Sequence, residues 1–360
     1  MSVAVRASEP VASPAPAASL FRDFSQPWLD LNEKAVLITG GTGSFGKHFV
    51  KTMAARYKPR RVVIFSRDEL KQFEMAQEFS QKDYPFMRYF IGDVRDRDRL
   101  DLALRDIDYV VHAAAMKQVP TAEYNPFECI RTNVFGAENL VYAALRRNVK
   151  KVVALSTDKA ANPVNLYGAS KLASDKIFVA ANNLSGADGP RFSVVRYGNV
   201  MGSRGSVVPF FRKLAADGAE SLPITDARMT RFWITLEQGV NFVLSSMKMT
   251  RGGEIFVPKI PSTTITDLAR LIEPKLAQHV VGIRPGEKLH ETMVPADDSH
   301  STVELDDRYV ILASFAIASR EAYLNSGAKP VHEGFSYSSD SNPEQLDARG
   351  LQKLIELAYA

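Results

Sequence analysis

The stretch Val36-Leu37-Ile38-Thr39-Gly40-Gly41-Thr42-Gly43-Ser44-Phe45-Gly46 decides the fold class of this chain. An apolar run, a glycine-rich turn and a helix-forming segment follow one another in it. The spacing Gly40-x-x-Gly43-x-x-Gly46 lets the backbone approach a pyrophosphate closely at a helix N-terminus. Ordinary turns also use glycines, but this strand–turn–helix order favours nucleotide binding. The residues expected at the nucleotide are Gly40, Thr42, Gly43, Ser44, Phe45 and Gly46.

From residue 34 onward, short β-rich runs alternate with longer amphipathic segments. The expected strands are Ala35–Thr39, Arg61–Ser66, Arg88–Ile91, Tyr109–His112, Val152–Leu155 and Phe192–Arg196. The helical segments between them include Ser44–Tyr57, Asp68–Phe79 and Asn165–Asn182. This alternation predicts an α/β fold, a Rossmann-type doubly wound parallel sheet with helices on both faces. Ligands in such folds bind at the carboxyl ends of the strands.

Changes in composition divide the chain into four parts. Residues 1–31 are rich in Ala, Pro and Ser, which predicts a disordered leader ending in a docking segment, Phe21 to Leu31. Residues 32–200 are the expected nucleotide domain. Glycines and prolines then punctuate shorter elements, so residues 201–335 are expected to form a smaller mixed α/β substrate lobe that partly returns to the main domain. Residues 336–360 are expected to form a tail and a helix.

Composition also excludes several classes of protein. The net charge of +4 is mild, and no dense basic run supports binding of nucleic acid. The single cysteine, Cys129, excludes an intrachain disulfide, suits a cytoplasmic location and is expected to be a small, partly buried residue and not a nucleophile. No apolar run is long enough to span a bilayer, and the leader lacks the apolar stretch of a signal peptide. No metal site is predicted.

The end of the second expected strand distinguishes NAD from NADP. An NAD enzyme usually has an acidic residue there, whereas this chain has Ser66 and Arg67, with Lys71 one helical turn further on. Two cations suit a 2′-phosphate, which predicts NADP, and Asp68 is expected to cap the helix that begins there. Beyond the third strand, Asp93 and Val94 either hold the adenine edge or belong to a simple loop. Ala113 and Ala114 complete the predicted cofactor set.

A second informative stretch runs from Ser156-Thr157-Asp158-Lys159 to Tyr167-Gly168-Ala169-Ser170-Lys171. Tyr167 and Lys171 have the i, i+4 spacing that places both on one face of a helix. An ammonium near Tyr167 favours the phenolate, so this tyrosine can accept a proton from a hydroxyl. Redox chemistry needs only the tyrosine, the lysine and a hydroxyl such as Thr157. The additional pair, Asp158 and Lys159, indicates a step besides hydride transfer.

Together these residues resemble the extended short-chain dehydrogenase/reductase superfamily. Further matches are His112-Ala-Ala-Ala115 and Thr132-Asn133-Val134. Four longer stretches narrow the resemblance to the inverting UDP-N-acetylglucosamine 4,6-dehydratases. They are Ser66-Arg67-Asp68-Glu69-Leu70-Lys71-Gln72, Ala114-Ala115-Met116-Lys117, STDKAANPVNLYGASK and Arg284-Pro285-Gly286-Glu287-Lys288-Leu289-His290-Glu291. The resemblance runs from about residue 32 to Phe335-Ser-Tyr-Ser-Ser-Asp340.

The resemblance implies the substrate UDP-N-acetylglucosamine, a recycled NADP and a homo-oligomer, hexameric or otherwise even-numbered. The product would open the pathway to pseudaminic acid on flagellins or surface glycans. Tyr167 would take the proton of the 4-hydroxyl during oxidation, with Thr157 bonded to that hydroxyl and Lys171 holding the phenolate and the nicotinamide ribose. The 4-ketone acidifies carbon 5, water leaves from carbon 6, the hydride returns to carbon 6, and reprotonation inverts carbon 5.

Asp158 and Lys159 stand where retaining sugar-nucleotide dehydratases carry Asp-Glu. We expect Lys159 to be the carbon-5 base and Asp158 the acid for the departing hydroxyl. A lysine acts as a base only when neutral. Burial and the charge of Lys171 are expected to lower the pKa of Lys159, while Asp158 opposes them.

Further residues are expected around the substrate. The candidates are Lys117, Asn199, Arg204, Val207, Arg228 and Arg284. Arginines suit a diphosphate because they bind it in a bidentate geometry. His112 is expected to be structural, and Gln118 stands where the family often has a histidine.

Three alternatives fit parts of the pattern. A UDP-sugar 4-epimerase would share the glycine turn, Tyr167 and Lys171 but would not need Asp158 and Lys159. A non-catalytic NADP-binding sensor would not need Tyr167 or Lys171. A retaining 4,6-dehydratase would differ only in the configuration of carbon 5.

Overall fold

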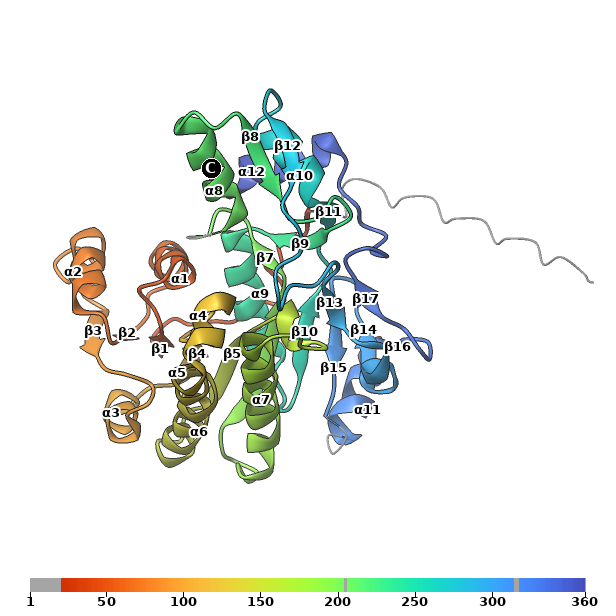
Figure 1. Ribbon diagram of the computed structural model, residues 1–360. Coiled ribbons are helices and arrows are strands. Elements are labelled where there is room, and N and C mark those ends of the chain that lie inside the picture. Colours follow the sequence, from red (N-terminus) through yellow and green to blue (C-terminus); the bar gives the residue numbers. More distant parts are fainter. Residues whose placement is uncertain (1–20, 204–205, 314–316, 360) are drawn as a thin grey trace, which may run out of the picture.

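The computed structural model describes residues 21–203, 206–313 and 317–359 (Figure 1). Its main feature is a ten-stranded sheet of order β16-β14-β15-β10-β6-β5-β4-β1-β2-β3. Seven neighbouring strands are parallel: β1 (Ala35–Thr39), β2 (Arg61–Ser66), β3 (Met87–Ile91), β4 (Tyr109–His112), β5 (Lys151–Thr157), β6 (Arg191–Tyr197) and β10 (Ile255–Pro258). The order 3-2-1-4-5-6 confirms the predicted doubly wound α/β fold.

Helices cover both faces of the sheet. One face carries α3 (Arg97–Ala103), α6 (Gly136–Arg146) and α7 (Leu166–Ala180), which pack against one another in that order. On the other face, α1 (Ser44–Arg56) packs on α9 (Leu236–Met249), and α2 (Glu69–Glu78) lies over β2 and β3. The strands are buried almost throughout, as expected for a parallel sheet covered on both sides. The predicted helices and strands therefore exist, with bounds shifted by one or two residues.

The connection from β4 to α6 is irregular. It contains α4 (Val119–Tyr124), α5 (Pro126–Ile130) and a π-helical turn, Arg131–Phe135. Asn133, in the π-helical turn, accepts a bond from the Met116 amide (2.8 Å) and donates to the Met116 carbonyl (3.0 Å). π-Helical turns occur often at functional sites. This one fixes the loop that follows β4 at the carboxyl edge of the sheet.

The last third of the chain contributes to both parts of the molecule. Antiparallel strands β15 (Arg308–Ile311), β14 (Thr302–Glu304) and β16 (Lys329–Pro330) extend the main sheet, and α11 (Ile317–Asn325) follows β15. The smaller lobe, at the top of Figure 1, has its own apolar core. It contains β7 (Asn199–Val200), α8 (Val207–Ala216), β8 (Ser221–Ile224), β9 (Thr230–Ile234), β11 (Ser262–Thr264), α10 (Ile265–Ile272), β12 (Ala277–Val280) and α12 (Ala348–Tyr359). Strands β13 (Thr292–Val294) and β17 (Tyr337–Ser338) form a separate antiparallel pair, and Met293, Val294 and Tyr337 in it are buried in the main core.

Two predicted boundaries differ from the structure. The terminal helix α12 is not a separate tail, because Leu351 and Leu354 are buried in the core of the smaller lobe. The disordered leader does not extend to residue 31: Phe24 and Leu31 are buried in the main core, and the Arg22 guanidinium donates to both carboxylate oxygens of Glu344 (2.8 and 2.7 Å). The predicted docking segment over residues 21–31 thus packs on the fold. Residues 1–20 lie outside the described part.

Candidate active site

The catalytic stretch lies at the carboxyl end of β5. The strand ends at Thr157, and a single 3₁₀ turn, Asp158–Ala160, follows it. The Thr157 hydroxyl donates to the Asp158 carboxylate (2.8 Å). Helix α7 begins after Asn165, whose side-chain oxygen accepts from the Gly168 amide (2.7 Å). A Cβ at Gly168 would lie 2.2 Å from the Lys159 carbonyl, so only glycine allows this close approach.

Lys159 lies between two buried carboxylates. Its ε-nitrogen is 3.0 Å from Asp158 Oδ1 and 3.4 Å from Glu291 Oε1, and both acidic side chains are at most 2 % exposed. Burial lowers the pKa of Lys159, but attraction to Asp158 and Glu291 outweighs it, so the pKa is raised above its ordinary value. The expected lowering of this pKa is therefore wrong for this structure. Lys159 is an ammonium ion at neutral pH.

Glu291 is the site residue that the sequence did not reveal. It directly precedes β13, and Ser339 fixes its backbone on both sides: the Glu291 amide donates to the Ser339 hydroxyl (2.9 Å), and its carbonyl accepts from the Ser339 amide (2.8 Å). Two further cations lie beside its carboxylate, Lys288 at 3.7 Å and Arg231 at 3.9 Å. Its place at the end of the Arg284–Glu291 stretch was the available signal, but a motif does not show which of its side chains turns inward.

Tyr167 is buried beside this cluster. Burial raises its pKa to about 12, opposed by the positive charge of Lys159 and by a hydrogen bond with Thr157. The cation that favours its phenolate is thus Lys159, whereas the sequence pattern suggested Lys171. Burial lowers the pKa of Lys171, opposed by Asp175 one turn further along α7. The two buried lysines therefore have opposite pKa shifts.

Asp175 belongs to a buried polar network beneath the site. Its carboxylate accepts from the Ser156 hydroxyl (2.7 Å) and from the Arg196 guanidinium (3.3 Å). Arg196 also donates to the Met293 carbonyl in β13 (3.0 Å). The network therefore connects β5, α7 and β6 to the strand that follows Glu291.

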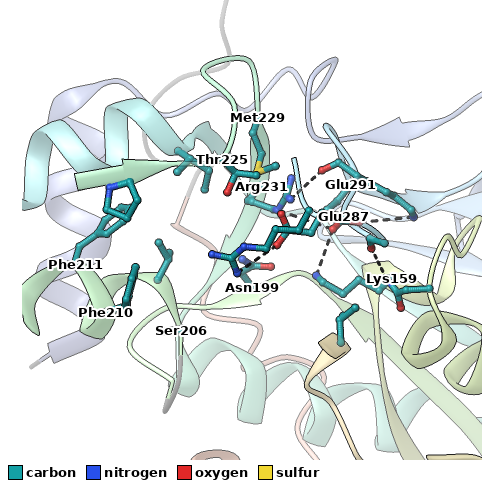
Figure 2. Close-up of a pocket in the computed structure, with 18 of the residues that line it drawn as sticks. Lys159, Asn199, Ser206, Phe210, Phe211, Thr225, Met229, Arg231, Glu287 and Glu291 are labelled. Carbon is teal, nitrogen blue, oxygen red and sulfur yellow. Dashed lines mark hydrogen bonds and ion pairs between the residues drawn. The ribbon is translucent and has the colours of Figure 1, made fainter. Parts of the chain in front are cut away.

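A cavity of about 620 Å³ opens between the two lobes above Lys159. Figure 2 shows Lys159 and Glu291 pointing toward one another on one side and the aromatic rings of α8 on the other. The described residues that line the cavity are Val119, Lys159, Asn165, Asn199, Ser206, Val207, Pro209, Phe210, Phe211, Lys213, Pro223, Thr225, Met229, Arg231, Ile265, Arg284, Gly286, Glu287, Lys288 and Glu291. Five of them are cationic side chains and two are carboxylates, and this excess of positive charge suits an anionic ligand.

The expected substrate residues are distributed unevenly. Asn199, Val207 and Arg284 line the cavity. Arg228 does not: its exposed guanidinium pairs with Asp226 (2.9 Å), and Arg231 lines the cavity in its place. Lys117 and Gln118 follow β4 at exposed positions, and the Gln118 side chain accepts from the Thr121 hydroxyl (3.2 Å). Arg204 lies outside the described residues.

The glycine-rich turn has the features of a pyrophosphate cradle. Helix α1 begins after Gly43 with no side-chain cap from that residue and no acidic residue in its first turn, which leaves a positive helix end. A Cβ at Gly46 would lie 2.1 Å from the Gly41 carbonyl, and one at Gly40 would lie 2.9 Å from the backbone of Ala114. The turn is therefore tight enough to bring Thr42, Ser44 and Phe45 and the loop after β4 close together. These residues fit a dinucleotide.

The end of β2 presents Ser66 and Arg67 as expected. The Ser66 hydroxyl bonds with Thr42 of the glycine turn (3.1 Å), and the exposed Arg67 lies 3.7 Å from Asp93 after β3. Asp68 caps α2, as predicted, by accepting from the Lys71 amide (3.0 Å). The ammonium of Lys71 also lies 2.6 Å from the Asp68 carboxylate, so these two side chains form an ion pair with each other.

The other residues predicted to bind the cofactor mainly contact neighbouring parts of the protein. Val94 is buried against Gly136, and Ala113 and Ala114 follow β4 beside the glycine turn. His112 is structural as expected: its Nδ1 bonds with the Thr39 hydroxyl (2.8 Å), and burial lowers its pKa to about 3. Cys129 is a buried free thiol.

Comparison with known proteins decides the family. Residues 36–313 match the profile of the family described as "Polysaccharide biosynthesis protein". The chain belongs to this family. A relative from Campylobacter jejuni subsp. jejuni serotype O:2, named UDP-N-acetylglucosamine 4,6-dehydratase (inverting), is 58% identical over 329 residues, 90% of this chain and 98% of its own. A relative from Rickettsia canadensis, named UDP-glucose 4-epimerase, is 40% identical and covers 90% of this chain and 95% of its own.

Solved structures in this fold group bind nicotinamide cofactors. The dTDP-glucose 4,6-dehydratase DesIV from Streptomyces venezuelae, solved with NAD and TYD bound, is similar with a TM-score of 0.62. It is 26% identical, and the match covers 71% of this chain and 86% of that one. The polysaccharide biosynthesis family thus shares its fold with a sugar-nucleotide dehydratase.

None of the helices in the described ranges is both long and apolar enough to cross a membrane. Within residues 21–203, 206–313 and 317–359, no group of three or more His, Cys, Asp or Glu side chains is arranged to hold a metal ion.

Proposed function

We propose that this protein is a UDP-N-acetylglucosamine 4,6-dehydratase that inverts carbon 5. Its product would be a UDP-2-acetamido-2,6-dideoxy-L-arabino-hexos-4-ulose, a precursor suited to pseudaminic acid. One observation carries the proposal: Lys159 lines a cavity rich in cations, pairs with the buried Asp158 (3.0 Å), and is the cation whose charge favours the phenolate of Tyr167. The 58% identity to a relative with that name supports it.

The proposed cofactor is NADP. When bound, NADP would supply the redox chemistry of the reaction, as temporary acceptor of a hydride from the sugar. Arg67 and, after turning from Asp68, Lys71 would hold the 2′-phosphate. The glycine turn would hold the pyrophosphate at the start of α1. The similar dehydratase DesIV was solved with NAD, so the choice of dinucleotide needs its own test.

In the oxidation step, Tyr167 would take the proton of the 4-hydroxyl. The Thr157 hydroxyl would hold the same oxygen, and the charge of Lys159 would stabilise the phenolate. Because burial alone raises the tyrosine pKa, these two favourable contacts are needed for the tyrosine to act as a base. Lys171, one turn along α7, would hold the nicotinamide ribose.

In the elimination step, Lys159 would remove the carbon-5 proton and Asp158 would protonate the departing 6-hydroxyl. Asp158 is buried, and its Oδ2 has no hydrogen-bond partner among the described residues, so it can bind a substrate hydroxyl. Lys159 must first lose its own proton, since only the neutral amine is a base. The raised pKa makes this lysine an uncommonly strong base once it is neutral.

The nucleotide part of the substrate would occupy the cavity toward α8. Arg284 and Arg231 would bind the diphosphate, and Asn199 and the start of α8 at Val207 would line the uridine. An apolar wall with a few cations is the usual composition of a nucleotide site.

An epimerase is the alternative that one observation favours, because relatives at about 40% identity are named UDP-glucose 4-epimerase. Incubation with UDP-N-acetylglucosamine in deuterated water, followed by mass spectrometry and NMR, separates the two functions. Dehydration with inversion gives the loss of one water, deuterium at carbon 5 and the ring couplings of the L-arabino sugar. An unchanged mass, apart from exchange, would contradict the proposal. Retention of configuration at carbon 5 would indicate a retaining dehydratase.

A further inference from the structure

Glu291 has no role in the proposed oxidation and elimination steps, yet its carboxylate lines the cavity and its backbone is fixed by hydrogen bonds. Its side chain is 2 % exposed, and Ser339 holds its backbone through both the amide and the carbonyl. The Ser339 hydroxyl in turn bonds with the Thr230 hydroxyl at the start of β9 (2.7 Å). Glu291 therefore has little freedom to move away from Lys159.

The carboxylate of Glu291 is incompletely paired. Its Oε1 lies 3.4 Å from the Lys159 ε-nitrogen, and its Oε2 has no hydrogen-bond partner among the described residues. A buried carboxylate with an unpartnered oxygen destabilises a fold, so natural proteins keep such groups mainly where they act. The position beside Lys159 indicates what this one acts on.

We propose that Glu291 is the positioning residue for Lys159: its carboxylate holds the ε-amino group at the base of the cavity and strengthens it as a base. The proposal rests on the proposed function and assigns Glu291 no contact with the sugar. Asp158, which also pairs with Lys159, is then free to exchange this contact for the substrate hydroxyl without loss of the lysine's position.

The charged groups that face Lys159 determine in which direction its pKa changes when the charge of Glu291 is removed. Asp158 and Glu291 favour its ammonium form, whereas Arg231 opposes it. Tyr167 faces it from α7, and Lys288 lies behind Glu291, where its ammonium is held by the Ala161 carbonyl (2.5 Å). Lys288 (3.7 Å) and Arg231 (3.9 Å) are the other cations beside the Glu291 carboxylate. Removal of the Glu291 charge would therefore lower the pKa of Lys159 and weaken it as a base.

The test is the Glu291→Gln variant, which keeps size and removes charge. Deuterium uptake at carbon 5 is followed against pH in wild type and variant. We expect the acid limb, the part of the profile in which the rate rises with pH, to shift to lower pH by roughly one unit or more. The plateau should fall by about threefold for each unit, because a weaker base reacts more slowly. A residue that only supports the fold would lower the plateau and leave the limb in place.

Glu287→Gln is the matched control, since Glu287 lines the same cavity and pairs with Arg284 (3.9 Å) instead of Lys159. It should leave the acid limb in place, whatever it does to the rate. Glu291→Asp keeps the charge and should return the limb toward the wild-type position, which keeps the test valid if the glutamine variant folds poorly.

A second measurement needs no turnover. Labelling of Lys159 with acetic anhydride against pH, read by peptide mass spectrometry, reports when the amine becomes neutral. We expect the midpoint to fall in Glu291→Gln and not in Glu287→Gln. If the midpoint falls although wild type does not dehydrate UDP-N-acetylglucosamine, the role of Glu291 stands and the proposed function fails. If both the midpoint and the acid limb are unchanged in Glu291→Gln, the role of Glu291 is refuted.

Discussion

The glycine-rich turn and the base of the cavity are built in opposite ways. The turn uses consecutive residues between β1 and α1, and its shape follows from glycines at fixed spacing. The base of the cavity uses Lys159 after β5, Arg231 in β9 and Glu291 before β13, three segments far apart in the chain. The chemistry of the turn is therefore a local property. The proton affinity of Lys159 depends on how distant segments pack.

The comparison also shows why two neighbouring lysines differ. Lys159 precedes Tyr167 in the chain and Lys171 follows it on α7. The Lys159 side chain is 27 % exposed, whereas Lys171 is buried. Lys159 has two carboxylates within salt-bridge distance, and its pKa is raised. Lys171 has Asp175 as its counter-charge, and burial prevails. The partners supplied by the fold, more than burial itself, set the sign of the shift.

The largest effect is expected for Lys159→Met, which removes the amino group between Asp158 and Glu291. We expect deuterium uptake at carbon 5 to fall by about 10²- to 10⁴-fold, the usual contribution of a general base, with cofactor binding preserved. NMR measures the deuterium uptake, and a fluorescence titration measures cofactor binding. Lys213→Met, at the rim of the same cavity, is the control and should retain exchange. Wild-type exchange in Lys159→Met would remove Lys159 from the mechanism.

The network beneath the site is tested by Arg196→Met. Arg196 is 2 % exposed and connects Asp175 to the Met293 carbonyl, so its loss removes the ion-pair partner of a buried carboxylate and leaves that carboxylate only the charge of Lys171. Breaking a buried ion pair from one side destabilises proteins by about 3–5 kcal/mol. Urea unfolding should show a decrease in that range. The double variant Arg196→Met/Asp175→Leu should recover part of it, and equal stability of the single variant and wild type would show that the network is dispensable.

The local turn is tested by Gly46→Ala. The new Cβ would meet the Gly41 carbonyl at 2.1 Å, so the turn must shift away from the pyrophosphate. We expect dinucleotide affinity to fall by about tenfold or more, in line with the loss of one well-placed backbone contact. Gly43→Ala is the milder control, because its Cβ would come no closer than 3.4 Å to the Gly40 carbonyl. Equal affinity in Gly46→Ala would show that the turn is not at the cofactor.

The pH dependence of the wild type follows from Lys159. In the proposed mechanism only the neutral amine would remove the carbon-5 proton, and the raised pKa of Lys159 places its titration above neutrality. Deuterium uptake should therefore rise with pH above 7, by up to about tenfold per unit below the pKa. A rate that falls as the pH is raised from 7 to 9, with the fold intact by circular dichroism, would assign the carbon-5 base to another group.

The smallest effect is expected for Arg67→Asp. Arg67 is exposed after β2, so the change should leave the fold intact and replace a cation that suits a 2′-phosphate with an anion that repels it. We expect the ratio of NADP to NAD affinity to fall by about tenfold or more, since a charge-assisted contact is replaced by repulsion. Calorimetric titration with both dinucleotides measures it. An unchanged ratio of NADP to NAD affinity would show that Arg67 does not select the dinucleotide.

Much of the molecule follows from sequence patterns. The alternation after residue 34 predicted the parallel strands and the helices that cover them, because burial on both faces requires apolar runs separated by amphipathic helices. The pattern also placed Tyr167 and Thr157 near one another, at a strand end and a helix start. It misplaced Arg228, whose guanidinium pairs with Asp226 two residues earlier and not with the cavity. It also gave the wrong direction for the pKa of Lys159, because that pKa depends on Glu291, which the fold brings from a distant segment.

The amino-acid sequence by itself determined the α/β fold, the glycine turn at the start of α1 and the identity of the groups at the end of β5, because these depend on spacing over a few turns of chain. Tertiary structure alone decided that a carboxylate next to β13 lies 3.4 Å from Lys159 and that residues 21–31 pack on the fold. Electrostatic energy varies inversely with distance and with the local dielectric constant, and neither quantity exists until the segments have packed together.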